Sequence, residues 1–96
     1  MRTKRDRMDI MREILENVNK GRNTKSALMK YVGLSTVTLT VYLNYLRERG
    51  LIRDEEKGYV LTEKGKKVLD LLKEASSLES RLIFIMGELA KELEET

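Results

Sequence analysis

The sequence between residues 34 and 52 reads LSTVTLTVYLNYLRERGLI, and this stretch decides the fold. A hydroxyl side chain near its start, Ser35 or Thr36, is typical of a helix N-cap. Three leucines then recur at spacings of four and three, which places them on one face of a helix: Leu39, Leu43 and Leu46. Gly50 is a helix-ending signal. We therefore predict a helix that runs to Arg49 and buries its leucine face.

Two more helices are predicted before this one. The first runs from Arg7 to Asn19 and ends at Gly21, and its apolar stripe consists of Met8, Met11, Ile14, Leu15 and Val18. The second covers Lys25–Val32, with Thr24 as its cap and Gly33 as its end. Its buried residues are expected to be Ala27, Leu28 and either Tyr31 or Val32.

A hairpin and a long helix are predicted after residue 50. Two short β-prone runs, 51–53 and 59–61, flank the charged turn DEEKG. Thr62 then caps a helix that continues without proline to about Glu95. Some 33 residues at 1.5 Å each make a rod of roughly 50 Å, too long for a small head to cover. The fold class is mainly α (α+β), with residues 1–62 as the head domain and residues 63–96 as the helix.

The composition excludes several chemistries. The chain contains no Cys, His or Gln, which removes disulfides, thiolate nucleophiles, imidazole bases and the usual zinc ligands. We find no carboxylate cluster, no nucleophile–base pair and no glycine-rich phosphate loop, so we expect neither an enzyme nor a cofactor or metal. Apolar runs fall short of the ~20 residues that a membrane span needs. The N-terminus, MRTKRDR, lacks the apolar core of an export signal.

Charge is unevenly distributed. Residues 1–53 hold twelve Lys or Arg against five acids, a net +7, whereas residues 54–96 hold seven against eleven, a net −4. This pattern favours a head that binds a polyanion, carried on a separate appendage. The alternative is that the charges only keep a small protein soluble.

Two segments resemble a known family. Residues 34–52 resemble the recognition-helix segment of winged-helix regulators, and residues 59–69, YVLTEKGKKVL, resemble their second wing strand and following helix. From about residue 8 to 93, the chain is similar to small archaeal winged helix-turn-helix DNA-binding proteins. The resemblance implies binding of double-stranded DNA and homodimerisation through the last helix.

The outward face of the 36–49 helix supplies the candidate DNA contacts. Because its leucines pack inward, the residues expected outside are Val37, Thr38, Val41, Asn44, Tyr45 and Glu48. In a helix-turn-helix this face enters the major groove. Thr38 and Asn44 are candidates for base hydrogen bonds, and Val37 and Val41 for contacts with thymine methyl groups. The candidates for phosphate contacts are Ser35, Thr36 and Thr40.

Two features, one in this helix and one in the wing, depart from the usual pattern of the family. Val41 stands where related helices often have Arg or Lys, which suggests reading of A·T-rich sequence, little base reading, or contact with a protein. Partial burial of Val41 against the second helix is a further alternative. The wing tip is acidic, so only Arg53 and Lys57 are expected to contact phosphates there, unless the wing is simply a solvated turn.

A basic arm precedes the first helix. Its cations, at or before a helix N-terminus that disfavours them, suggest contact with phosphates or the minor groove: Arg2, Lys4, Arg5 and Arg7. A solubilising tail is the alternative. Further cations bracket the second helix and are placed to flank the same groove: Lys20, Arg22, Lys25 and Lys30.

The last helix carries a heptad seam. Its residues alternate spacings of three and four: Val68, Leu71, Ala75, Leu78, Leu82, Ile85 and Leu89. Such a seam needs a partner, and a second copy of the chain is the economical choice; packing onto the chain's own head is the alternative. Residues 63–73 have a net charge of +2 and residues 84–96 of −3, so an antiparallel coiled coil brings opposite charges together.

Taken together, the patterns predict a homodimeric double-stranded DNA-binding protein. It would act as a transcription regulator or as an architectural chromatin protein in the cytoplasm, associated with the nucleoid. No small-molecule ligand and no membrane partner are evident. The alternative from another class is a winged-helix adaptor that binds proteins without nucleic acid, which the outward Val37, Val41 and Tyr45 favour.

Overall fold

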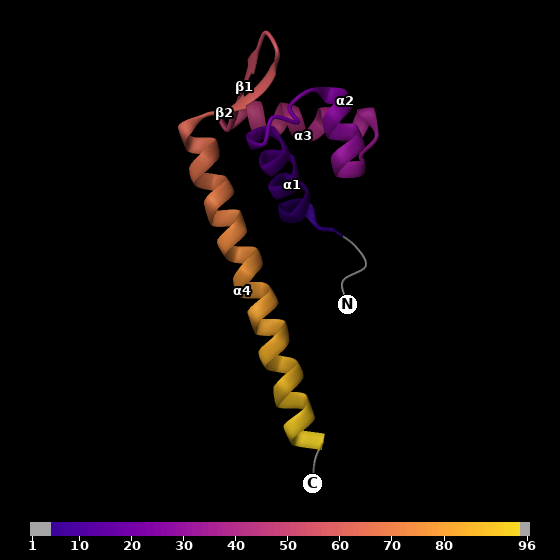
Figure 1. Ribbon diagram of the computed structural model, residues 1–96, viewed down its shortest axis with the longest axis vertical. Coiled ribbons are helices and arrows are strands. Elements are labelled where there is room, and N and C mark those ends of the chain that lie inside the picture. Colours follow the sequence, from indigo (N-terminus) through magenta and orange to yellow (C-terminus); the bar gives the residue numbers. More distant parts are fainter. Residues whose placement is uncertain (1–4, 95–96) are drawn as a thin grey trace.

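A computed structural model describes residues 5–94 and shows a small head from which one long helix projects (Figure 1). The molecule measures 63 × 27 × 20 Å along its principal axes. In chain order the elements are α1 (Arg7–Asn19), α2 (Lys25–Leu28), η1 (Met29–Gly33), α3 (Thr36–Glu48), β1 (Ile52–Glu55), β2 (Gly58–Leu61) and α4 (Glu63–Glu94). The predicted fold class, three helices with a two-stranded wing and then a long helix, is confirmed.

α1 begins and ends where the sequence signals lie. The Asp9 backbone N–H donates to Asp6 Oδ1 at 2.9 Å and the Asp6 N–H donates to Asp9 Oδ2 at 3.1 Å, which forms a capping box. Of the apolar stripe, Ile14, Leu15 and Val18 are buried, whereas Met8 is 58% exposed at the first turn; Ile10, which is not part of the stripe, also packs against the core.

The second predicted helix begins as an α-helix and continues as a π-helix. The Thr24 hydroxyl accepts from the Ala27 N–H at 3.1 Å and so caps α2 as expected. After Leu28 the chain continues as the wider π-helical turn η1, which buries Val32 and leaves Tyr31 exposed. Of the two alternatives for this position, Val32 is therefore the core residue.

α3 is the best-predicted element. Its N-cap is Ser35, its C-cap is Arg49, and its three inward leucines, Leu39, Leu43 and Leu46, are at most 1% exposed. One complete face of the helix is thus committed to the core, which leaves the opposite face free.

The wing is slightly longer than predicted. β1 and β2 pair antiparallel from Ile52↔Leu61 to Glu55↔Gly58, so that the turn shrinks to two residues. Gly58 has a φ of +137° and lies against Asn23, which leaves no room for a side chain. Asn23 extends the sheet's bonding, because its carbonyl accepts from the Tyr59 N–H and its Nδ2 donates to the Tyr59 carbonyl, both at 2.8 Å. The loop after α1 thereby holds the wing in place.

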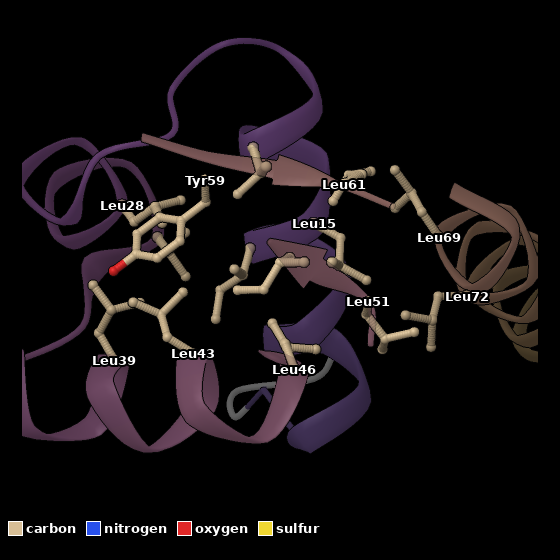
Figure 2. Packing of buried hydrophobic residues seen from close by; sticks show 14 residues of the cluster. Leu15, Leu28, Leu39, Leu43, Leu46, Leu51, Tyr59, Leu61, Leu69 and Leu72 are labelled. Carbon is tan, nitrogen blue, oxygen red and sulfur yellow. The ribbon is translucent and has the colours of Figure 1, made fainter. Parts of the chain in front are cut away.

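The hydrophobic core includes the start of α4. Leu69 and Leu72 are buried in the same cluster as the head residues, and they approach it from the side on which Leu51 and Leu61 lie (Figure 2). Gly65 of α4 lies so close to the Leu51 carbonyl that a Cβ there would overlap the oxygen. The head and the first turns of the rod therefore share one core, which crosses the boundary expected between residues 62 and 63.

The remainder of α4 is exposed. No residue between 73 and 94 is buried. Along the predicted seam, Val68 is half-buried against the head core, whereas the others are open to solvent: Leu71, Ala75, Leu78, Leu82, Ile85 and Leu89. Ile83, Phe84 and Met86 are exposed as well. The chain's own head thus covers only the beginning of the rod.

Candidate nucleic-acid interface

The free face of α3 is open and largely apolar. Val37 is 76% and Val41 63% exposed, with Asn44, Tyr45 and Glu48 also exposed. Thr40 is half-buried. The alternative that Val41 is buried against the second helix is wrong. It instead lines a groove of about 350 Å³ between α1 and α3, together with Arg7, Met11, Tyr42 and Tyr45.

The hydroxyl groups at the start of α3 already have partners. Ser35 Oγ accepts from the Thr38 N–H at 3.2 Å and donates to Thr38 Oγ1 at 3.1 Å. Thr36 Oγ1 donates to Met29 Sδ at 3.4 Å. All three side chains are exposed, so they can still meet a ligand, but the structure uses them first to cap α3 and to join it to η1.

Asn44 is held by a residue that the sequence analysis did not single out. Arg47 Nη1 donates to Asn44 Oδ1 at 2.8 Å, while its Nε and Nη2 donate to Asp54 Oδ1 and Oδ2 at 3.0 and 3.2 Å. The hydrogen bond with Asp54 raises the pKa of Arg47. This chain of contacts joins α3 to the wing. The three-residue spacing of Asn44 and Arg47 was a visible signal, but the approach of Asp54 was not.

Ion pairs engage several of the charged residues of the wing. Asp54 is engaged by Arg47, and Arg53 donates to Glu55 Oε2 through Nε and Nη2 at 3.1 and 3.0 Å. Lys57 is exposed at the tip. Of the two predicted wing cations, Lys57 is exposed and can approach a phosphate. A phosphate that binds Arg53 would have to displace Glu55 from it.

The basic arm divides into two parts. Arg2 and Lys4 lie outside the described residues. Arg5 Nη1 donates to Glu13 Oε1 at 2.6 Å and to the Val32 carbonyl at 2.7 Å, so this arginine ties the arm to α1 and η1. Arg7 is exposed at the mouth of the groove between α1 and α3.

Cations and tyrosines associate at two further places. The Arg22 guanidinium lies 4.4 Å and the Lys30 ammonium 5.5 Å from the centre of the Tyr31 ring. The Arg49 guanidinium lies 4.9 Å from the Tyr45 ring, at the exposed end of α3. Lys20 and Lys25 are exposed. Tyr31 and Arg49 were not predicted as part of the surface.

Other kinds of site are not found in the part of the chain that the structure describes. Between residues 5 and 94, no group of three or more His, Cys, Asp or Glu is placed to hold a metal ion. Within the same range, no helix has the length and apolar character needed to cross a membrane.

A three-helix head with a β-hairpin beside an open third helix defines a winged helix-turn-helix module. A family model described as winged helix-turn-helix matches residues 4–80, and the chain belongs to this family. Two relatives come from the archaeon Methanocaldococcus jannaschii. An uncharacterized HTH-type transcriptional regulator is 34% identical over 79 residues, which cover 81% of this chain and 74% of the relative. An uncharacterized protein is 30% identical over 73 residues, covering 76% and 75%.

Solved structures share the fold. Sso10a-2, a DNA-binding protein from Sulfolobus solfataricus, superimposes with a TM-score of 0.78 at 25% identity, covering 91% of this chain and 95% of the other. The activation domain of the phage T4 transcription factor MotA gives a TM-score of 0.59 at 12% identity, with 86% of each chain covered, and shows a likeness of fold alone.

Proposed function

We propose that this protein binds double-stranded DNA as a homodimer, through the free face of α3. It would act as a transcription regulator or an architectural chromatin protein. The observation that carries the proposal is the division of α3 into a buried leucine face and an open face on a winged head. A single α-helix fits the major groove of B-DNA, and the open face is the part available to enter it.

Charge and similarity support the same function. The first 53 residues carry a net +7, which attracts the phosphate backbone. A matching solved structure is described as a DNA-binding protein, and a matching relative as a transcriptional regulator.

Each group of candidate residues has a proposed role. Base edges would be contacted from α3 by Val37, Thr38, Val41, Asn44 and Tyr45. Phosphates would be contacted by Lys25, Ser35, Thr36, Thr40, Arg53 and Lys57. The arm would supply Arg2, Lys4 and Arg7, while Arg5 would first have to leave Glu13.

The second half of the proposal concerns α4. Its seam exposes large apolar side chains over more than five turns, from Leu71 to Leu89, and such a surface is normally covered in a folded assembly. A second copy offers the matching seam. We propose antiparallel pairing, because the basic start of one rod (+2) then lies beside the acidic end of the other (−3).

One observation favours a different function. Val37, Val41 and Tyr45 form an apolar exposed face, and this face also suits a partner protein. A protein-binding adaptor would use the same helix without nucleic acid.

A salt titration separates the two functions. We expect the full chain to bind A·T-rich and G·C-rich duplexes, with log K falling linearly with log salt by about 0.9 for each phosphate contacted. Neutralising Arg2, Lys4 and Arg7 to Gln should flatten the slope on every duplex alike. The matched control, Lys91→Gln on the distal rod, should leave the slope unchanged. Binding to neither duplex at low salt would overturn the DNA-binding proposal and leave the adaptor.

A further inference from the structure

The orientation of the Asn44 amide is determined by its neighbour. A guanidinium group carries only donors, so the Asn44 atom that lies 2.8 Å from Arg47 Nη1 must be the oxygen. The amide NH₂ group then occupies the other position. Because Asn44 is exposed on the open face of α3, this NH₂ group offers two donors to a ligand, whereas the oxygen keeps only one lone pair that Arg47 does not use.

Arg47 is itself held from a second element. Its two-point contact with Asp54 uses the planar fork of the guanidinium, and the ring of Tyr59 lies 6.0 Å from the guanidinium carbon. Both Asp54 and Tyr59 belong to the wing. The orientation of Asn44 on α3 is therefore set through Arg47 by the position of the wing.

The bases of DNA differ in what they offer to such a group. In the major groove, guanine presents two acceptors, N7 and O6, and thymine presents the acceptor O4. Adenine presents the acceptor N7 beside the donor N6, and cytosine presents the donor N4. The usual two-bond contact between asparagine and adenine needs the amide oxygen to accept from N6. In this protein Arg47 already occupies one of the two lone pairs of that oxygen, and its positive charge disfavours the approach of a second donor such as adenine N6.

We propose that Arg47, anchored by Asp54, is a positioning residue that makes Asn44 act as a hydrogen-bond donor, so that the protein prefers guanine or thymine to adenine or cytosine at the base Asn44 faces. This inference rests on the proposed insertion of α3 into the major groove. It assigns base selectivity to a residue that itself touches no base.

The test compares base preference at every position of a bound duplex. The wild-type protein should show one position at which guanine or thymine is favoured, and Asn44→Ala should abolish that preference. Arg47→Met removes the donor, frees the amide to turn and should raise the relative affinity for adenine at that position by about fivefold or more. Asp54→Asn should shift the preference in the same direction by less.

Controls separate positioning from charge and from folding. Lys91→Met removes an equal charge on the distal part of α4 and should leave the preference unchanged. The salt slope of Arg47→Met should equal that of the wild type, because Arg47 is engaged with Asp54 rather than with phosphate. In the DNA-free protein, the side-chain NH₂ resonances of Asn44 should shift in Arg47→Met and stay unchanged in Lys91→Met.

The inference would be overturned by a wild-type preference for adenine at the Asn44-dependent position, by an unchanged preference in Arg47→Met, or by unchanged Asn44 resonances. The resonances are measured without DNA. A failure of DNA binding is therefore seen separately, as wild-type protein that binds no duplex while the Asn44 signals still respond to Arg47→Met, and this result too would overturn the proposed base preference.

Discussion

Two glycines of α4 stand in opposite surroundings. Gly65 is buried against the Leu51 carbonyl, whereas a Cβ on Gly87 would have no neighbour within 4 Å. In an ordinary helix interior either glycine costs about 1 kcal/mol relative to alanine. The same substitution should therefore have opposite effects at the two positions.

We expect Gly65→Ala to lower the free energy of unfolding by about 1–3 kcal/mol, because the new methyl group displaces α4 from the backbone of residue 51. Gly87→Ala should raise it by up to about 1 kcal/mol. Urea unfolding followed by circular dichroism measures both. Equal effects from the two substitutions would show that the close approach at Gly65 does not constrain the fold.

The predictability of single residues depended on the range of their contacts. The leucines of α3 were predicted because helical spacing alone determines which face they share. The contacts of Arg5 were not predicted, and Arg47 was missed, because their partners belong to other elements. Val32 lies 27 residues after Arg5, and Asp54 lies in β1, seven residues after Arg47. No local pattern announces such a pair.

Helix and strand ends were predicted where capping chemistry is local. Thr24 and Ser35 accept from backbone N–H groups three residues later, and both helices begin there. The π-helical turn of η1 has no such signal. It covers the residues at which Val32 is buried and Tyr31 is exposed.

Thr62 joins three elements at the base of the wing. Its Oγ1 accepts from the Gly65 N–H at 2.9 Å, which caps α4, and donates to the Gly50 carbonyl at 2.6 Å, which lies just after α3. We expect Thr62→Ala to lower the free energy of unfolding by about 1–2 kcal/mol, since both bonds are lost. Thr62→Ser keeps the hydroxyl and should lose much less in the same urea titration. A comparable loss from serine would indicate that the methyl group, not the hydroxyl, is what matters.

At the scale of the whole molecule, the exposed seam of α4 sets the proposed assembly. The long helix was predicted from its cap at Thr62 and its run without proline. The shared core at Leu69 and Leu72 was not predicted, because the apolar pattern of α4 does not say which stripe faces the head. The structure separates these stripes: one packs against α1 and β2, and the seam is open from Leu71 onward.

Single cysteines test how two rods pair, since the chain has none of its own. With the exposed parts of the seams, Leu71 to Leu89, aligned end to end, an antiparallel pair places Leu71 beside Leu89 of the second copy. A mixture of Leu71→Cys and Leu89→Cys should therefore cross-link under oxidation, while neither variant should link to itself. Gel electrophoresis without reductant measures the products.

A control for accidental contact uses Phe84→Cys, which lies about 100° around the helix from the seam position Ile85 and should not link to Leu71→Cys. Efficient self-linking of Leu89→Cys would indicate parallel rods. An absence of any cross-link, together with a monomeric mass in sedimentation, would contradict the dimer.

The shared core of head and rod also fixes the direction in which the seam of α4 faces relative to the head. Leu69 and Leu72 pack in the core of the head, so the rotation of α4 about its own axis is fixed relative to the head. Each residue of an α-helix adds about 100° of rotation and 1.5 Å of rise. Deleting one residue after Leu72 would rotate the seam relative to the head by about 100°, whereas deleting seven consecutive residues after Leu72 would restore its phase to within about 20° and shorten the rod by about 10 Å. In a dimer joined along this seam, the number of residues in one helix therefore determines both how far apart the two α3 faces lie and in which directions they point.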